Sequence, residues 1–451
     1  MTLHSVLLLA FAFPLFGASC AMPGPAGAAV AGGSSPFDAL SKAPPPLGWS
    51  SWSSTWSGGG QKLSDAYVKA QADVMAAKLK SVGYVYINLD DGWAKGFDEH
   101  GRLQPDPKKF PDGIASLAAY LHAKGLKLGI YLTPGLRAEA YLANGTVAGT
   151  DIHLQDIADI TQNGNTQKNS PGKAYHIDYS KPGAVEYIQS YADMVAAWGV
   201  DYIKMDFVGP GGGNQKADTR DDMKQWHAAL KKTGRPIWLE LSNSMSIDSV
   251  DVWKATSNGW RIENDVEAYN RSGPPQLTTW AKVAVRFNDA PKWAKFADPG
   301  GWNDLDSLEI GNGDSDGITV DERHTVMTLW AISCSPLILG SDLTKLDDTD
   351  LAILANPEVL AVNQAGHVAI PLSQQTPRQV WRVKNPDGSF TVALFNLDQT
   401  EAKVAVQWSE LGIAGPAAVR DLWLHKSLGK LASGYEATLA AHACMLLNVG
   451  P

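Results

Sequence analysis

The feature that most constrains this chain is a repeated alternation of apolar, β-rich segments with segments of helical periodicity. From about residue 44, each apolar segment ends in a polar or glycine-rich turn, and a helical pattern such as that of residues 183–199 follows. Such alternation predicts parallel strands joined by crossover helices. The predicted strands cover residues 47–52, 84–90, 126–132, 201–207, 236–242, 259–264, 300–306 and 335–341. Eight strands over roughly 310 residues predict an α/β fold of the (β/α)8 TIM-barrel type, with a doubly wound open sheet as the alternative.

The pattern changes after about residue 365. Residues 379–398 read as a β-hairpin, because two alternating runs flank the turn sequence Asn-Pro-Asp-Gly. Further short strands follow to the end of the chain. We therefore predict a barrel over residues 44–365 and a smaller C-terminal antiparallel β-sandwich domain over residues 366–451.

The first 21 residues have the pattern of an export signal. A short apolar run, too short to span a bilayer, is followed by small residues, although no lysine or arginine precedes it. We expect cleavage after Ala21, a flexible linker over residues 22–43, and a secreted or periplasmic protein. Lipid attachment at Cys20 is the less favoured alternative, because Gly17 stands where leucine is usual. The rest of the chain contains no candidate for a membrane span.

Composition narrows the classes of partner. Hydrophobic residues make up 44% of the chain and charged residues 19%, as in a folded globular protein. The formal charge of -9 argues against nucleic acid or an anionic membrane as the main partner. Sixteen tryptophans are large core fillers for the most part, but several could line a site for sugar rings. Without Cys20 only Cys334 and Cys444 remain, so we predict no disulfide framework.

One predicted buried strand ends on two opposite charges. In the stretch VDYIKMDFVGPGGG, at residues 200–213, Lys204 and Asp206 are two positions apart and therefore share a face. Such a pair is either a structural ion pair or part of a reaction centre. A Schiff-base aldolase would need a lysine of lowered pKa, whereas Asp206 would raise the pKa of Lys204. We therefore interpret Lys204 as a fixed hydrogen-bond donor and Asp206 as an ionised carboxylate.

Acidic residues gather at the carboxyl ends of the predicted strands. They are Asp90, Asp91, Asp206, Asp265, Asp304 and Asp306, with Lys204 and Arg261 among them. One such residue alone is more often a solvated cap, but the carboxyl ends of barrel strands meet at one mouth. Asp304 and Asp306 could hold a hard cation; the sequence lacks the usual metal-ligand spacings, however, and we predict neither metal nor cofactor. Two such carboxyls, one ionised and one protonated, are what glycoside hydrolysis requires.

Seven segments, in this order, carry a resemblance to a known family. They are PPLGWSSW, YINLDDGW, FPDGIASLAAYLHAKGLKLGIY, DYIKMD, WRIENDV, GGWNDLDSLEIGNG and LWAISCSPLILGSDL. They resemble glycoside hydrolase family 27, the α-galactosidase and α-N-acetylgalactosaminidase family, from about residue 44 into the C-terminal domain. The resemblance implies a retaining exo-glycosidase that removes terminal α-linked galactose from oligo- or polysaccharides by double displacement.

The resemblance also implies roles for individual residues. Asp206 matches the nucleophile, and Asp265 matches the general acid/base. Asp90 and Asp91 match the pair that binds the 4- and 6-hydroxyls of the sugar. Lys204 matches the lysine that binds O3 and O4 of the sugar, and Arg261 matches the arginine near O2. Trp49, Tyr131 and Trp302 match residues of the pocket wall. Asp304 matches an aspartate that supports the site without binding the sugar itself.

The fifth strand departs from the family pattern. Ser242 stands where the α-galactosidases usually carry glutamate, unless Glu240 takes that place in the alignment. Family members that accept an N-acetyl group, and some β-L-arabinopyranosidases, also carry a small residue there. These two activities are therefore kept as alternatives, together with a catalytically silent sugar-binding protein. The sequence indicates neither the natural polymer nor the oligomeric state.

Overall fold

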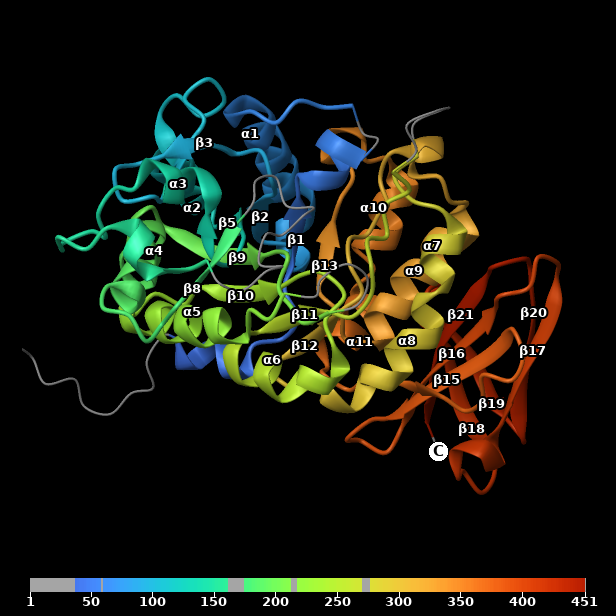
Figure 1. Ribbon diagram of the computed structural model, residues 1–451. Helices are drawn as coiled ribbons and strands as arrows, with labels where there is room; N and C mark the ends of the chain where they lie inside the picture. Colours follow the sequence, from blue (N-terminus) through green and yellow to red (C-terminus); the bar gives the residue numbers. More distant parts are fainter. Residues whose placement is uncertain (1–36, 58–59, 161–173, 212–216, 270–275, 451) are drawn as a thin grey trace, which may run out of the picture. The chain divides into compact units, whose positions relative to one another are not determined.

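The computed structural model describes residues 37–57, 60–160, 174–211, 217–269 and 276–450 (Figure 1). The predicted export signal and most of the predicted linker lie outside these residues. The last part of the linker segment contains a short 3-10 helix, η1 (Asp38–Lys42), and Leu40 within it is buried.

Eight parallel strands form one curled sheet, which confirms the predicted (β/α)8 barrel. The strands are β1 (Leu47–Ser50), β2 (Tyr86–Leu89), β5 (Lys127–Leu132), β9 (Val200–Met205), β10 (Trp238–Leu241), β11 (Gly259–Arg261), β12 (Trp302–Asp304) and β13 (Leu337–Leu339). Their order in the sheet is β12-β11-β10-β9-β5-β2-β1-β13. The two end strands meet through a parallel bridge between Leu308, just after β12, and Leu339. The backbone N–H of Leu308 donates to the carbonyl of Ile338 at 2.8 Å, so the ring closes there.

Helices follow the strands and cover the outside of the sheet (Figure 1). They are α1 (Asp65–Val74), α2 (Gly113–Ala123), α3 (Ala138–Ala143), α4 (Ala184–Ala197), α5 (Arg220–Thr233), α6 (Val250–Thr256), α7 (Trp280–Ala284), α8 (Arg286–Trp293), α9 (Val320–Ile332), α10 (Asp348–Leu354) and α11 (Pro357–Gln364). Local sequence starts several of them: Ser64 caps α1, and Thr319 with Glu322 forms a capping box at α9.

The loops at the carboxyl ends of the strands carry small sheets of their own. After β2, β3 (Ala94–Phe97) pairs with β4 (Leu103–Pro105). After β5, β6 (Leu136–Arg137) and β7 (Ala158–Asp159) flank β8 (Ala174–Ile177).

The inside of the barrel is apolar at one end and charged at the other. Tyr86, Tyr202, Trp238 and Trp302 belong to one buried cluster at the start of the strands. Two residues further along, Lys204 and Glu240 are register partners on β9 and β10. Because strand side chains alternate, these charged residues point to the same interior as the aromatic ones but one layer closer to the carboxyl end.

The C-terminal part is an antiparallel β-sandwich, as predicted. Its strands are β14 (Ile370–Pro371), β15 (Arg378–Lys384), β16 (Phe390–Asn396), β17 (Ala402–Gln407), β18 (Ala417–Asp421), β19 (Lys426–Leu431), β20 (Gly434–Leu439) and β21 (Cys444–Gly450). One sheet has the order β14-β15-β16-β21-β18-β19, and β17 pairs with β20 in the other. Val392, Leu394, Val404 and Val406 share a core between the sheets. The predicted hairpin is β15–β16.

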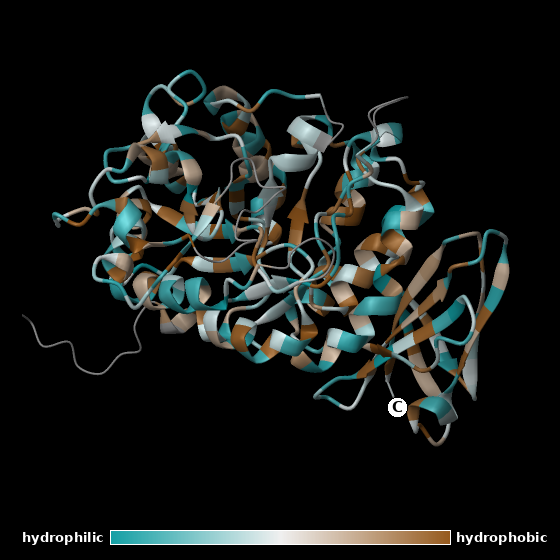
Figure 2. Cartoon of the chain, in the orientation of Figure 1, coloured by the Kyte–Doolittle hydropathy of each residue, from teal (hydrophilic) through white to brown (hydrophobic). Residues whose placement is uncertain are grey.

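Hydropathy follows this architecture. In Figure 2 the strand β13 is brown, the other barrel strands mix brown with white and teal, and the outer loops are mostly teal and white. Within the described residues we find no helix with the length and hydrophobicity that a bilayer-spanning segment needs.

Candidate active site

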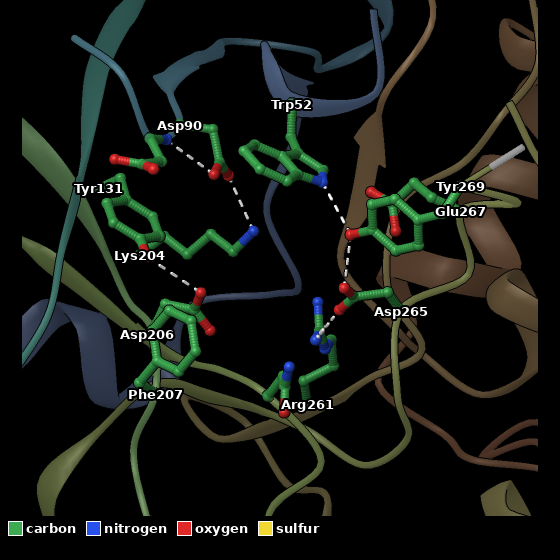
Figure 3. Close-up of a pocket in the computed structure, with 12 residues that line it drawn as sticks. Trp52, Asp90, Tyr131, Lys204, Asp206, Phe207, Arg261, Asp265, Glu267 and Tyr269 are labelled. Atoms are coloured by element: carbon green, nitrogen blue, oxygen red, sulfur yellow. Dashed lines mark hydrogen bonds and ion pairs between the residues drawn. The ribbon is translucent and has the colours of Figure 1, made fainter. Parts of the chain in front are cut away.

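A pocket of about 420 Å³ opens at the carboxyl ends of the barrel strands (Figure 3). Its lining residues are Trp52, Asp90, Asp91, Tyr131, Lys204, Asp206, Phe207, Asn243, Arg261, Asp265, Glu267 and Tyr269. The segments that end β1, β2, β5, β9, β10 and β11 therefore each contribute to the wall. Seven positions proposed from the sequence come together here: Asp90, Asp91, Tyr131, Lys204, Asp206, Arg261 and Asp265.

Lys204 makes its salt bridge across the barrel. Its Nζ lies 2.8 Å from Asp90 Oδ2, and no salt bridge between Lys204 and Asp206 is found. The sequence interpretation had paired Lys204 with Asp206, so this partner is a correction. Burial opposes the charge, but the carboxylates of Asp90 and Asp206 outweigh it and raise the pKa of Lys204. A lysine held charged in this way is a hydrogen-bond donor and a poor nucleophile.

Two hydroxyl groups orient the Asp206 carboxylate. Tyr131 donates its hydroxyl to Oδ2 at 3.1 Å, and Ser242 donates its hydroxyl to Oδ1 at 2.8 Å. Burial and the nearby aspartates raise the pKa of Tyr131, so its hydroxyl keeps its proton and can donate. Asp206 follows the last residue of β9, where the chain leaves the strand and the carboxylate can face the pocket.

Asp265 faces Asp206 from the other side of the pocket (Figure 3). Arg261 donates to its Oδ1, and the hydroxyl of Tyr269 donates to its Oδ2 at 2.5 Å. The indole N–H of Trp52 in turn donates to the Tyr269 hydroxyl at 2.9 Å. Burial favours a neutral Asp265, but Arg261 and Tyr269 outweigh burial and lower its pKa to about 2. In this arrangement Asp265 is therefore ionised.

Asp306 fixes the segment that carries Asp265. Its Oδ1 accepts from Arg261 at 3.2 Å, and its Oδ2 accepts from the backbone N–H of Val266 at 2.8 Å. Arg286 adds a second guanidinium at 3.7 Å. The sequence places Asp306 among the acidic strand ends and suggests for it, with Asp304, only a disfavoured role as a cation ligand. Its position two residues after Asp304 was the signal that could have singled it out.

Two tryptophans predicted as pocket walls lie elsewhere. Trp49 is fully buried, packs against Tyr67 of α1, and donates its indole N–H to the carbonyl of Ser341. Trp302 is in the apolar layer at the start of the strands and donates to the carbonyl of Ala43. Aromatic residues that the sequence did not single out, Trp52, Phe207 and Tyr269, line the pocket instead.

Ser242 and Asp304 lie behind the pocket wall. Ser242 is buried and reaches the site through Asp206, while its neighbour Asn243 faces the cavity. Asp304 accepts from the backbone N–H of Asp306 at 2.7 Å. Burial and the Asp306 charge, opposed by Arg261, raise the pKa of Asp304 to about 6. Both residues therefore support the site rather than line it.

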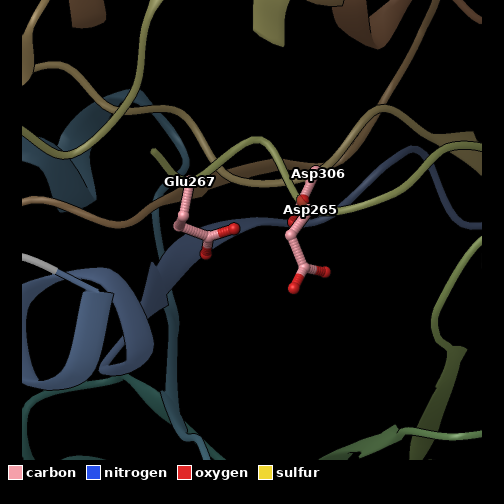
Figure 4. A group of neighbouring side chains, drawn as sticks. All are labelled: Asp265, Glu267 and Asp306. Atoms are coloured by element: carbon pink, nitrogen blue, oxygen red, sulfur yellow. The ribbon is translucent and has the colours of Figure 1, made fainter. Parts of the chain in front are cut away.

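Three carboxyls of this region approach one another closely enough to suggest a cation site. One oxygen from each of Asp265, Glu267 and Asp306 lies within 4.8 Å of the others (Figure 4). However, Arg261 already binds both Asp265 and Asp306. A metal ion would have to compete with that guanidinium, so the donor set does not fit a resident cation.

The sequence of the chain matches two family models. The model described as alpha galactosidase A matches residues 45–163 and 173–365, and the alpha galactosidase C-terminal beta sandwich domain matches residues 375–449. The α-galactosidase of Cyamopsis tetragonoloba is 31% identical over 414 residues, which are 90% of this chain and 86% of that protein.

Solved structures extend the likeness to the whole fold. The β-L-arabinopyranosidase of Geobacillus stearothermophilus, a GH27 protein, superposes with a TM-score of 0.83 at 30% identity and covers 93% of this chain and 99% of its own. The α-galactosidase I of Mortierella vinacea superposes with a TM-score of 0.71 at 29% identity, covering 90% of this chain and 96% of its own.

Proposed function

Since this chain belongs to the alpha galactosidase A family, glycoside hydrolase family 27, we propose that it hydrolyses terminal α-linked galactosides with retention of configuration. The chain is a glycoside hydrolase, and a carbohydrate is its substrate. The observation that carries the mechanism is the pocket in which two aspartates, Asp206 and Asp265, face each other (Figure 3). Retaining glycosidases need such a pair, one as nucleophile and one as acid/base.

In the first step Asp206 attacks the anomeric carbon. The hydroxyls of Tyr131 and Ser242 each occupy one of its carboxylate oxygens, which fixes the orientation of the carboxylate. Attack forms a covalent glycosyl-enzyme, and the bond to the leaving oxygen breaks. Lys204 supports this role, because its positive charge lies near the carboxylate without being bound to it.

Asp265 donates a proton to the leaving oxygen and then takes one from the attacking water. Its position opposite Asp206 supports this assignment. Around the sugar, Asp90 and Asp91 are proposed to bind the 4- and 6-hydroxyls, and Lys204 the 3- and 4-hydroxyls. Trp52 offers an apolar wall to the C–H face of the ring.

The test is direct assay of the purified protein with 4-nitrophenyl α-galactoside. Proton NMR should show the α-anomer of galactose as the first product; the β-anomer first would rule out retention. Asp206→Ala should lose activity by several orders of magnitude. Azide added to that variant should give β-galactosyl azide, because azide takes the place of the missing nucleophile. Unchanged activity in Asp206→Ala would remove the residue from the mechanism.

β-L-Arabinopyranosidase activity is the second candidate. The observation that favours it is the high TM-score of the Geobacillus stearothermophilus β-L-arabinopyranosidase over nearly the full length of both chains. A β-L-arabinopyranoside has the ring configuration of an α-galactoside and lacks only the hydroxymethyl group at C5. Comparing kcat/KM for the two 4-nitrophenyl glycosides decides between them, since the preferred sugar has the higher value.

Export is a further part of the proposal. It is supported by the apolar run and the small residues that precede Ala21. Expression of the full chain with detection of the mature N-terminus in the medium or periplasm would test it, and retention of residues 1–21 in the cytoplasm would contradict it.

A further inference from the structure

Two buried glutamates, of which one lines the pocket, are linked by one serine hydroxyl. Ser53 Oγ lies 3.0 Å from Glu267 Oε1 and 2.6 Å from Glu309 Oε1. Glu267 is 2% exposed and Glu309 is 1% exposed. Ser53 follows β1, Glu267 follows β11 and Glu309 follows β12. Three separate strand ends therefore build this cluster, which we call the Ser53 cluster.

The Ser53 cluster must hold at least one carboxyl proton. Two hydrogen bonds need two hydrogens on their axes, whereas the serine hydroxyl supplies one, and ionised carboxylates only accept. One glutamate is therefore a carboxylic acid that donates to Ser53. Burial, opposed by the Ser53 hydrogen bond, raises the pKa of Glu309 to about 8, and burial with neighbouring acids raises that of Glu267. The second oxygen of each carboxyl has no hydrogen-bond partner within the described part of the chain.

Glu267 is the member of the cluster that lines the pocket. The ionisable groups that face it are Asp265, Tyr269, Asp306, Glu309, Lys204, Arg261 and Arg286. Salt bridges among the described residues join the cations of this group to Asp90, Asp265 and Asp306, and none joins them to Glu267. A proton is therefore what neutralises Glu267, and an oxygen of Asp265 lies within 4.8 Å of one of its oxygens (Figure 4).

Asp265, the proposed acid/base, is held ionised, whereas Glu267 is held protonated. Arg261 and Tyr269 hold Asp265 ionised, yet a general acid needs a proton before the leaving group departs. Glu267, whose pKa is raised by burial, lies close to Asp265. A small side-chain rotation or a single bridging water is enough to connect an oxygen of Asp265 with an oxygen of Glu267.

We propose that Glu267 stores the proton that Asp265 delivers to the leaving oxygen. The proposal rests on the proposed function. The O–H bond of Glu267 breaks, an O–H bond forms on Asp265, and the negative charge passes to Glu267, where the Ser53 hydroxyl stabilises it. Asp265 then protonates the leaving oxygen. When water attacks the glycosyl-enzyme, its proton returns through Asp265 to Glu267, so the cycle balances. Glu267 acts through Asp265 and is thus a positioning residue.

The test compares two substrates that differ in their need for a proton. In Glu267→Gln the amide oxygen still accepts from Ser53, but no proton can be released. The value of kcat/KM reports the glycosylation step, and for methyl α-galactoside we expect it to fall by ~100-fold. For α-galactosyl fluoride, whose leaving group departs without a full proton transfer, it should change little. Equal losses with both substrates, or no loss with either, would overturn the proposal.

Two further variants make the result interpretable. Asp265→Asn should show the same selectivity with a larger loss. If it does not, the acid/base assignment fails; if it does and Glu267→Gln does not, only the proton store fails. Glu309→Gln keeps a neutral group at the same hydroxyl and should lose less methyl α-galactoside activity than Glu267→Gln.

Ser53→Ala covers the case in which Glu267→Gln does not fold. Ser53→Ala removes the hydroxyl that stabilises ionised Glu267, so the proton leaves Glu267 less readily. We expect a loss in the same direction, larger for methyl α-galactoside than for the fluoride. Circular dichroism and thermal unfolding establish that the variant is folded. An equal effect on both substrates in folded Ser53→Ala would also overturn the proposal.

Discussion

At the scale of single residues, the pairing of charges was the part that the sequence could not supply. Spacing alone places Lys204 and Asp206 on one face of β9, and the pocket contains both. It cannot show that Asp90, from a strand that is not next to β9 in the sheet, takes the ammonium of Lys204. Which carboxylate reaches the lysine depends on barrel closure, which brings distant segments of the chain together.

Lys204→Met tests that pairing. Asp90 is 2% exposed, so loss of the lysine leaves a buried carboxylate without its cation. We expect destabilisation by about 3–5 kcal/mol, and loss of activity by orders of magnitude. Adding Asp90→Asn should recover much of the stability but none of the activity. Denaturant unfolding measures the first effect, and an additive double mutant would contradict the pairing.

Ser242→Ala separates two roles for the residue. If Ser242 orients Asp206, the loss of a hydrogen bond to a charged group should cost about 1.5–3 kcal/mol, or ~10–100-fold in kcat/KM. That loss should be the same for an α-galactoside and an α-N-acetylgalactosaminide. A loss confined to one sugar would instead show that Ser242 reads the C2 substituent. Kinetics with both 4-nitrophenyl glycosides measures the difference.

At the scale of elements, the predicted strands are longer than the observed ones. Many residues that line the pocket, such as Asp206 after β9, lie just beyond the observed ends, although Lys204 and Arg261 lie within the last residues of their strands. The two tryptophans near β1 differ in this way: Trp49 lies within β1 and packs against Tyr67 of α1, whereas Trp52 lies beyond the strand and faces the cavity. Sequence periodicity locates a strand well, but it does not show which face points inward when both faces are buried.

Gly259→Ala tests how closely β10 and β11 pack inside the barrel. A Cβ at Gly259 would lie 2.1 Å from Glu240 Oε2, an oxygen that also accepts from the indole of Trp238. Overpacking of this kind costs about 1–3 kcal/mol, so the thermal unfolding midpoint should fall. Gly450→Ala, where no atom lies within 4 Å of the added carbon, is the matched control. Equal midpoints for the two variants would show that Glu240 moves aside freely.

At the scale of the whole molecule, strand–helix alternation was sufficient to predict the barrel, and the hairpin pattern at residues 379–398 was sufficient to predict the β-sandwich. These patterns are local and repeated, so each unit reinforces the same architecture. The Ser53 cluster was not predictable in the same way. Ser53, Glu267 and Glu309 come from three distant segments, and a buried glutamate looks like a surface one in the sequence.

Buried carboxyls also make the stability of the molecule depend on pH. Asp222, in the first turn of α5, is 2% exposed and accepts from the Tyr179 hydroxyl at 2.7 Å. Burial, opposed by that hydrogen bond, raises its pKa to about 7. The unfolded chain releases this proton near pH ~3.9, whereas the folded chain keeps it to about pH 7. The stability that Asp222 contributes is therefore full below that lower pH and is lost as pH rises through the window.

Asp222→Asn should reduce this pH dependence. The amide stays neutral at every pH and still offers an oxygen to Tyr179, so the variant should gain stability relative to the wild type above pH ~7, by an amount on the order of a few kcal/mol. The free energy of unfolding of the variant should still fall as pH rises, because the pKa of Glu309 is also raised, to about 8. Thermal unfolding at about pH 5 and about pH 8 measures the change. Asp251→Asn is the control, because Asp251 is an exposed residue of α6. A stability gain of Asp222→Asn over the wild type that is no larger at pH ~8 than at pH ~5 would contradict the linkage, because only the wild type loses the contribution of protonated Asp222 as pH rises.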